Sequence, residues 1–341
     1  MQKLINGEGS VEKIGALISG TKDNLVFLIT GKHFLQNHDL DFLRNFNVQH
    51  YIKQGSNVEE VEIGLATKLF QQSGAETIIA IGGGSVIDLA KAIIYELRTS
   101  IGFVPNFLVA PTTAGSGSEA TSFAVVYRNK KKISLIDPQL LPPIVILDPS
   151  LIYSLSTYQL AVSGMDALAQ AIESYWNRNA TPESRTFATE AIKSWKENFF
   201  LALTHKDKNA MAKMLMAAHL AGKAINITRT TGPHALSYYL TARFNVPHGQ
   251  AVSLFLPVFI LYNPPDTSLF ELLGVKNEAD AARWVRDTMK EAGLATTFSE
   301  LGINKDDILD ELLKDVNEER FANNPSPFDS KRLRQMLDEL I

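Results

Sequence analysis

Short apolar runs alternate with helical patterns over the first 150 or so residues. The runs are rich in Val, Ile, Leu and Phe and are expected to be strands, at residues 24–30, 48–53, 77–85, 103–111, 132–137 and 143–148. Between them, segments such as residues 58–74 repeat apolar residues at helical spacing. Apolar strands that alternate with helices are typical of a mostly parallel sheet covered on both faces. The pattern therefore predicts an α/β unit in this part of the chain.

Long helical patterns dominate the rest of the chain. They cover residues 159–177, 182–204 and 210–226, and a mixed tail follows at residues 278–341. The change in character places a domain boundary near residues 150–157. We expect an α/β domain at residues 1–154 and an all-helical domain at residues 155–341. The lysine run at residues 130–132 is more typical of a solvated hairpin than of an anion site.

Composition narrows the classes of protein. The 341 residues are 45% hydrophobic and 21% charged, as in ordinary globular proteins, and are enough for two cores. The net charge of −4 gives no electrostatic reason to expect a nucleic acid or an anionic membrane as partner. Without cysteine, any metal must be held by nitrogen and oxygen. No run has the apolar character of a signal peptide or membrane span, so we expect a cytoplasmic protein.

Four residues have the types and spacing of a metal site. Asp166 and Gln170 are four apart in a segment without helix breakers, so both lie on one helix face. His234 opens a second helical run, and His248 follows Pro247 on the turn that ends it. One carboxylate, one amide oxygen and two imidazoles could converge on a divalent cation. Gln170 is the odd member, because a neutral amide is an unusual ligand.

A glycine-rich turn follows the strand at residues 77–85. Glycines there let the backbone approach a diphosphate closely, and the next helix supplies N–H groups and a positive dipole end. The turn comprises Gly82, Gly83, Gly84 and Ser85. It lacks the spaced glycines of the standard dinucleotide fingerprint. By itself such a turn is as often structural as functional.

A second turn of small and hydroxyl residues strengthens nucleotide binding as the interpretation. It spans residues 111–119, also follows an apolar strand, and offers Thr112, Thr113, Ser116 and Ser118. Two such loops after neighbouring strands favour a bound nucleotide over a purely structural role. Asp88 and Lys91 fall in the first turns of the helix after the glycines. We expect them to be solvated, although either could approach the cofactor.

The end of the first strand bears on the choice of cofactor. Many dinucleotide enzymes keep an acidic residue there for the adenosine ribose hydroxyls. This chain has Gly31 and Lys32 instead, and Lys32 could neutralise a 2′-phosphate. The pattern slightly favours NADPH over NADH, although a surface lysine after a turn glycine is an equal alternative.

Together these motifs resemble the iron-containing alcohol dehydrogenase family. The markers are GGGSVIDLAKA, PTTAGSGSEAT, DPSLIYSLS, GMDALAQAIES and VPHGQAVSL. The resemblance implies a dehydroquinate synthase-like architecture, with a cleft for NAD(P) and a divalent metal such as Fe²⁺, Zn²⁺ or Mn²⁺. Family members hold the metal with one aspartate and three histidines. Asp166, His234 and His248 match three of these ligands, and Gln170 occupies the fourth place, where histidine is usual. Dimers are common in this family, so a homo-oligomer is expected.

Tyr238 is a second departure from the family pattern. It lies one turn after His234, where many members carry a histidine assigned to proton relay. Tyr238 or Tyr239 could replace that histidine, or water or the cofactor ribose could supply the proton. A packed, hydrogen-bonded tyrosine is the structural alternative for Tyr238.

Within the family, residues 173–188 and 224–252 are similar to phosphonoacetaldehyde reductases. Arg229, Thr230 and Thr231 precede His234, and a cation with two hydroxyls would suit a phosphonate, carboxylate or phosphate. In the structural alternative, Arg229 forms a salt bridge and the threonines cap a helix.

The sequence therefore predicts a metal-dependent aldehyde reductase, reversible as an alcohol dehydrogenase, with NAD(P)H as hydride donor. Phosphonoacetaldehyde, reduced to 2-hydroxyethylphosphonate, is the candidate substrate. Two alternatives stay open. One is a lyase of the dehydroquinate synthase kind, which uses NAD transiently, although PTTAGSGSEAT and PHGQAV resemble the dehydrogenase side. The other is an inactive nucleotide-binding homologue, suggested by Gln170 and Tyr238.

Overall fold

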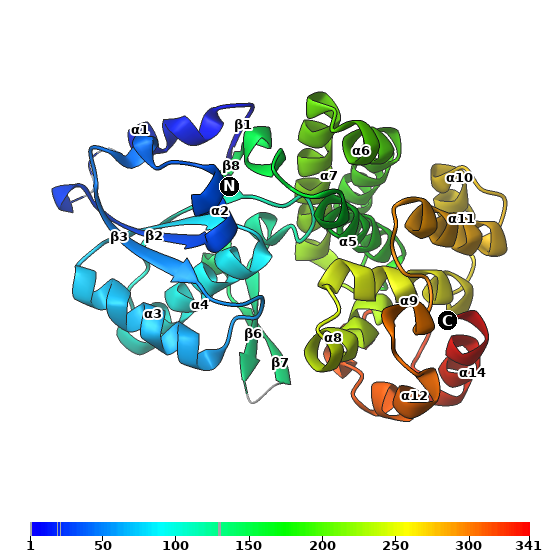
Figure 1. Cartoon of the computed structure of the whole chain (residues 1–341). Helices are drawn as coiled ribbons and strands as arrows, with labels where there is room; N and C mark the ends of the chain where they lie inside the picture. The colour runs from blue at the N-terminus through cyan, green and yellow to red at the C-terminus, as the bar shows by residue number, and fades with distance from the viewer. Residues whose placement is uncertain (1, 19, 21, 129–130) are drawn as a thin grey trace. The chain divides into compact units, whose positions relative to one another are not determined.

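The computed structural model describes residues 2–18, 20, 22–128 and 131–341. The chain divides into two units, Met1–Leu155 and Ser156–Ile341 (Figure 1). The first contains a parallel sheet and the second is helical, as the sequence pattern predicts.

A six-stranded parallel sheet forms the centre of the first unit. Its strands follow the order β1-β8-β5-β4-β2-β3. Their bounds are β1 (Lys3–Asn6), β2 (Leu25–Gly31), β3 (Asn47–Lys53), β4 (Thr77–Gly82), β5 (Asn106–Pro111) and β8 (Ile144–Leu147). Residues of β4 are all buried, which explains its unbroken apolar run. β1 was not predicted, because four mostly exposed residues give too short a pattern.

Helices cover both faces of this sheet. α3 (Glu60–Ser73) and α4 (Gly84–Ile101) lie on one side, where Phe27 of β2 packs edge-on against Phe70 of α3 (Figure 1). On the other side α1 (Ile14–Leu17) and α2 (Lys32–Asn37) complete an apolar core with Val26 and Leu28 of β2.

The strands β2, β4 and β5 end at one edge of the sheet. Thr30 pairs with Ile81, and Gly82 pairs with Pro111. The amide of Thr112 continues this ladder and donates to the carbonyl of Gly82 at 3.0 Å. The three loops predicted to bind a cofactor therefore begin side by side.

A separate antiparallel hairpin joins β6 (Phe123–Arg128) and β7 (Lys131–Ile136). The strand predicted at residues 132–137 thus belongs to this hairpin and not to the parallel sheet. The lysine run was expected in a solvated hairpin, and Lys130 lies outside the described residues.

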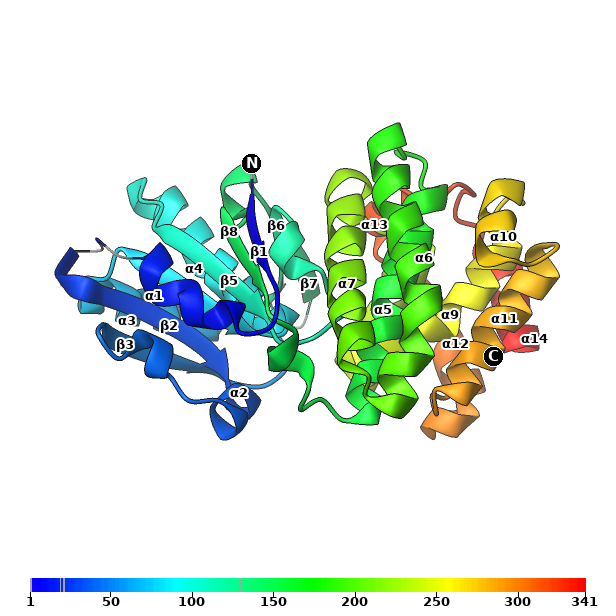
Figure 2. The same cartoon turned by 90° about the horizontal axis from the view of Figure 1, so that it is seen from above.

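The second unit is built from helices. They are α5 (Thr157–Trp176), α6 (Pro182–His205), α7 (Lys208–Thr228), α8 (Gly232–Phe244), α9 (His248–Tyr262), α10 (Thr267–Leu273), α11 (Glu278–Glu291), α12 (Lys305–Lys314), α13 (Glu318–Phe321) and α14 (Ser330–Leu340). Figure 2 shows α5, α6 and α7 side by side. A capping box between Ser156 and Gln159 starts α5. None of the described helices combines the length and the apolar character needed to cross a membrane.

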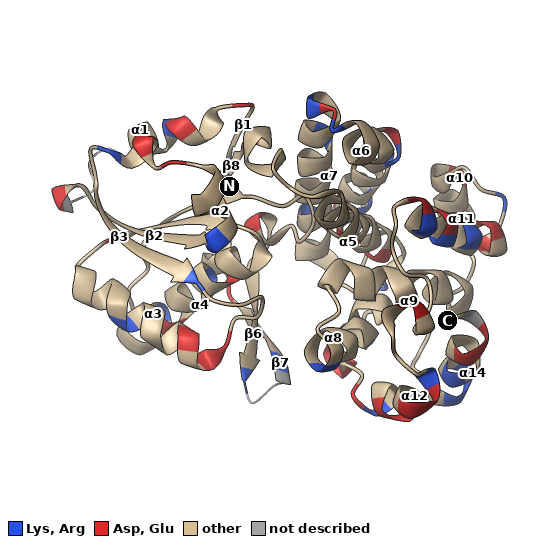
Figure 3. Cartoon of the chain, viewed as in Figure 1, with Lys and Arg blue, Asp and Glu red and all other residues tan. Residues whose placement is uncertain are grey.

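Charge is distributed unequally among these helices (Figure 3). α12 and α14 carry many charged residues, and pairs such as Lys305 with Asp338 link them. α9 has no Asp, Glu, Lys or Arg at all. α5 has only two charged residues, Asp166 and Glu173, and both are buried. Charges placed inside an apolar helix need a specific partner or function.

α9 was not predicted, and His248 was wrongly placed on a turn. His248 is the first residue of α9, and Pro247 is its N-cap. Nearly all of α9 is buried, so its apolar residues show no 3.6-residue period, and Pro257 lies inside the helix. The signal that usually identifies a helix is absent from this segment.

Gly249 allows α9 to begin directly against the backbone of α5. A Cβ atom at Gly249 would lie 2.0 Å from the carbonyl oxygen of Val162 and 3.1 Å from the Cβ of Asp166. Because only glycine permits this approach, the residue fixes His248 beside Asp166.

We predict that Gly249→Ala forces α9 away from α5. The added methyl should cost at least about 2 kcal/mol of unfolding free energy and lower the Tm by several degrees. Gly64→Ala is the matched control, because Gly64 is an exposed helical glycine with open space around its Cβ position. That change should raise stability by about 0.5–1 kcal/mol. Thermal unfolding of both variants decides: an unchanged Tm in Gly249→Ala would contradict the close approach.

Candidate metal and cofactor sites

Three of the four predicted metal ligands come together in the second unit. Asp166 of α5, His234 of α8 and His248 of α9 each offer a ligand atom, and these atoms all lie within 4.8 Å of one another. His234 Nε2 is 3.4 Å from Asp166 Oδ1. The two imidazole rings have centroids 5.2 Å apart and lie at 68°. The arrangement suits one cation bound by three side chains.

Asp166 has the chemistry of an ionised ligand. Burial by itself would raise its pKa, but hydrogen bonding and charge from His234, His248 and Gln170 lower the pKa below the ordinary value. Its buried Oδ1 accepts no hydrogen bond of good geometry within the described structure. A buried carboxylate oxygen without a donor is costly, and a bound cation would remove that cost. The residues present therefore fit a divalent metal.

Gln170 lies one turn after Asp166 and is buried. Its side chain is hydrogen-bonded to Asp166, and only the amide nitrogen can donate to a carboxylate. The structure therefore places Gln170 within the cluster. Coordination of a cation would use the other arm of the same amide, Oε1.

Glu173 completes the cluster, although the sequence pattern did not predict a role for it. It lies two turns after Asp166 on α5 and is fully buried. Its Oε1 is hydrogen-bonded to Nδ1 of His234, while Oε2 accepts from the amide of Thr231 at 2.6 Å and from its hydroxyl at 2.9 Å. A carboxylate at Nδ1 holds the proton there and leaves Nε2 for a metal. The signal was the helical spacing of Asp166, Gln170 and Glu173.

The two carboxylates also set the charge of His234. Burial opposes a charged ring, but Glu173 and Asp166 together raise the pKa of His234 to about 9. Without a metal the imidazole therefore holds an extra proton at neutral pH. A cation that binds Nε2 must displace this proton.

Tyr238 lies beside the cluster, as its position one turn after His234 predicts. Its ring is stacked with that of His248, with centroids 6.0 Å apart. Its side chain is hydrogen-bonded to Thr230 and Arg320. Burial raises the pKa of Tyr238, so the phenol keeps its proton. Tyr238 is thus packed against His248 through its ring and hydrogen-bonded to Thr230 and Arg320 through its hydroxyl.

Arg229 is the C-cap residue of α7 and has an unusual backbone conformation. Its φ of 66° and ψ of 179° belong to a region used almost only by glycine, at a cost of about 1–3 kcal/mol. Its guanidinium Nη1 donates to the carbonyl of Asn226 at 3.0 Å. Thr231 is the N-cap residue of α8, but its hydroxyl donates to Glu173 and makes no capping bond.

The candidate cofactor residues lie at the carboxyl edge of the parallel sheet. Gly31 ends β2, and the exposed Lys32 begins α2. The other two loops touch each other: a Cβ at Gly83 would lie 3.3 Å from Thr113, and one at Gly84 only 2.7 Å from Ser116. The structure thus brings Gly82, Gly83, Gly84 and Ser85 together with Thr112, Thr113, Ser116 and Ser118 at this edge.

Lys91 was wrongly expected to be solvated. It is completely buried and donates to the carbonyls of Ser118 at 2.5 Å and Thr121 at 2.7 Å. Asp88 accepts from the hydroxyl of Ser118 at 2.5 Å and from the amide of Val125 at 3.1 Å. Both side chains hold the second loop against α4. Their hydrogen bonds stabilise the conformation of the second loop, which forms part of the candidate cofactor site.

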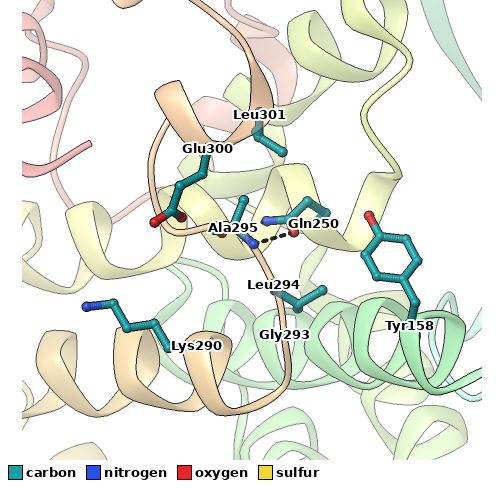
Figure 4. Close-up of a pocket in the computed structure, with 8 residues that line it drawn as sticks. All are labelled: Tyr158, Gln250, Lys290, Gly293, Leu294, Ala295, Glu300 and Leu301. Carbon is teal, nitrogen blue, oxygen red and sulfur yellow. Dashed lines mark hydrogen bonds between the residues drawn. The ribbon is translucent and has the colours of Figure 1, made fainter.

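An open hollow of about 500 Å³ lies elsewhere in the second unit (Figure 4). Its wall includes Gln250, which exchanges two hydrogen bonds with the backbone of Ala295, at 2.8 and 3.0 Å. These bonds fix the loop after α11 onto the first turn of α9. None of the candidate ligands lines this hollow.

We predict that Glu173→Gln weakens metal binding by about 10–100-fold, because the amide cannot accept from both His234 and Thr231. Glu190→Gln, an exposed change on α6, is the control and should bind normally. Calorimetric titration with Zn²⁺ measures both variants, and circular dichroism checks that they are folded. Unchanged affinity in Glu173→Gln would remove Glu173 from the site.

Comparison with known proteins relates this geometry to a family. Residues 2–149 match the model of iron-containing alcohol dehydrogenases, and residues 160–341 match the C-terminal model of the same family. Phosphonoacetaldehyde reductase of Streptomyces viridochromogenes is 31% identical, over 65% of this chain and 62% of that protein. The chain therefore aligns with less than two thirds of this relative.

Two further proteins match over nearly their whole lengths. NADPH-dependent butanol dehydrogenase of Clostridium saccharobutylicum is 27% identical, over 97% of this chain and 94% of that protein. The crystal structure of sulfoacetaldehyde reductase from Bifidobacterium kashiwanohense in complex with NAD⁺ is 25% identical, with a TM-score of 0.91, over 99% of this chain and 96% of that one. Since the two family models together cover almost all of the sequence, this chain belongs to the iron-containing alcohol dehydrogenase family.

Proposed function

We propose that the chain reduces a small aldehyde to a primary alcohol with NAD(P)H and a divalent metal, and catalyses the reverse oxidation. The buried cluster of Asp166, His234 and His248, with His234 oriented by Glu173, is the observation that carries this proposal. When bound, the metal would supply Lewis-acid polarisation of the carbonyl, and the nicotinamide would supply hydride. The carbonyl carbon gains a hydride, its oxygen gains a proton, and NAD(P)⁺ is the second product.

The residues of the cluster have distinct roles in this proposal. Asp166 supplies the negative charge, and His234 and His248 supply neutral imidazole nitrogens. The ring of Tyr238 packs against His248, but its hydroxyl is hydrogen-bonded to Thr230 and Arg320, so we assign the proton that the alcohol oxygen gains to water or the cofactor ribose.

The sheet edge of the first unit supplies the proposed cofactor site. The first turn of α4 begins at three consecutive glycines, so its amides and dipole can hold a diphosphate. Lys32, exposed at the start of α2, favours a 2′-phosphate and hence NADPH.

For the substrate we propose an anionic aldehyde such as phosphonoacetaldehyde. The partial alignment with phosphonoacetaldehyde reductase supports this choice, as does the position of Arg229 three residues before Gly232, where α8 begins. Stoichiometric oxidation of NADPH with aldehyde separates this function from a lyase that returns its NAD.

We predict that Asp166→Ala and His248→Ala abolish metal binding and aldehyde reduction together, because each removes a ligand. His205→Ala, a change at an exposed histidine, is the control and should keep both. NADPH oxidation is followed with Fe²⁺, Zn²⁺ or Mn²⁺ supplied, and elemental analysis measures bound metal. Full activity in metal-stripped His248→Ala protein would contradict the metal role. Tight NADPH binding without turnover for any aldehyde and metal would instead identify an inactive homologue.

We predict that Gln170→His binds Zn²⁺ and Fe²⁺ more tightly than the natural chain, because imidazole is the softer and stronger donor for these ions. Gln71→His, an exposed change on α3, controls for affinity that any added histidine brings. Competition with a chelator of known affinity measures the change. Equal affinity in Gln170→His and the natural chain would show that Gln170 is no ligand.

A further inference from the structure

A second arginine, Arg320, lies beside the candidate site. It belongs to α13, which packs against α8, the helix that carries His234. The amide of Asn317 donates to the carbonyl of Ala235, next to His234, and the side chain of Asn317 accepts from the amide of Arg320. Arg320 is only 2% exposed. A guanidinium is thus buried next to α8, the helix that carries His234. A buried charge is costly, so it is expected to have a compensating interaction or a function.

Tyr238 connects this guanidinium to the metal ligands. One face of its ring is stacked on His248, and its hydroxyl end is hydrogen-bonded to Arg320. A small molecule held at His248 therefore has Arg320 within reach along the length of one tyrosine side chain. The length of a tyrosine side chain matches a short substrate with one reactive end and one charged end.

Arg229, which follows the last residue of α7, lies close enough to Arg320 for the two charges to interact. Its like charge and that of Arg320 repel, which, after burial, is the next cause of a lowered pKa for Arg229. The backbone of Arg229 is held in its strained form by two bonds to its carbonyl, from Asn177 at 3.1 Å and from Thr228 at 2.8 Å. Asn323, three residues after Arg320, donates to the carbonyl of Thr230 at 3.1 Å. The segments that carry the two arginines are thus tied together.

Two neighbouring guanidiniums form a receptor for an oxyanion. A guanidinium has planar pairs of N–H donors whose spacing matches the oxygens of a phosphonate or sulfonate. An anion bound between the two guanidiniums would also relieve their mutual repulsion. Glu319 is the acidic residue whose charge reaches Arg229, but it is exposed on the solvent side of α13.

We propose that Arg320, together with Arg229 and Tyr238, forms a subsite for the charged end of the substrate. The subsite selects a short aldehyde that carries a tetrahedral oxyanion, phosphonate or sulfonate, one carbon from the carbonyl. This inference rests on the proposed reductase function and assigns a specificity role to a residue outside the metal cluster.

The test compares kcat/KM for phosphonoacetaldehyde, sulfoacetaldehyde and uncharged propanal in the natural chain, Arg320→Met and Arg320→Lys. We expect Arg320→Met to lower the ratio of anionic to uncharged kcat/KM by about 30-fold or more, mainly through KM, for whichever oxyanion is the substrate. Arg320→Lys keeps the charge but loses the paired donors, so its loss should be intermediate. Arg286→Met, a partly buried arginine on α11, is the matched control and should keep the natural ratio.

A binding measurement separates failure of the subsite from failure of the reductase function. Methylphosphonate and methanesulfonate are titrated calorimetrically into the natural chain and each variant, with circular dichroism to confirm folding. Anion binding that Arg320→Met abolishes and Arg286→Met retains supports the subsite even if no aldehyde is reduced. Two results overturn the proposal: equal loss for propanal and the anionic aldehydes in Arg320→Met, or no preference for anionic aldehydes and no anion binding in the natural chain. If Arg320→Met does not fold, the ratio in Arg320→Lys decides in the same way.

Discussion

The arrangement of the helical unit depends on two carboxylates buried in one helix. Asp166 and Glu173 are the only charged residues of α5, and both are inside the protein. A buried carboxylate is tolerated only when donors or cations surround it. The two oxygens of Glu173 are hydrogen-bonded to His234 and to the amide of Thr231, the residue before α8. These bonds fix where α8 begins. Asp166 faces both histidines, and the contact of Gly249 with α5 brings the second of them into place.

The two units meet their chemical tasks by different means. At the sheet edge, the candidate cofactor loops offer backbone amides and small hydroxyls, which suit a ligand that brings its own negative charge. Lys91 and Asp88 work behind these loops and hold their shape through buried bonds. In the helical unit the charges belong to ionisable side chains. The protonation state of each of these side chains is set by its neighbours. Substitutions should accordingly act through loop geometry in the first unit and through charge in the second.

Local spacing in the sequence predicted those features that depend on one helix or one turn. The interval between Asp166 and Gln170 is enough to place both on one face, and the glycines after β4 are enough to indicate a close approach. Residue types and the family resemblance also predicted that Asp166 meets His234 and His248, but other features that depend on distant segments were missed. Lys91 is buried because carbonyls some thirty residues away surround it. α9 shows no 3.6-residue hydrophobic period because nearly all of its residues are buried. The surroundings of Arg320 form only when α13 packs on α8.

The amide at Gln170 changes the hardness of the proposed metal site without changing its formal charge. Histidine and glutamine are both neutral as ligands, so Asp166 supplies the only charge among the four in either case. The amide nitrogen already donates to Asp166, which draws electron density from the carboxylate that would bind the metal. Both effects weaken the hold on soft ions, whereas Glu173 strengthens His234 as a donor. The balance favours harder ions such as Mn²⁺ over Zn²⁺ more than a three-histidine site does.

A phosphonate or sulfonate held near Arg320 would place negative charge at the other end of the substrate. The cation and the two arginines would then bind opposite ends of one short molecule, which fixes its orientation for hydride transfer.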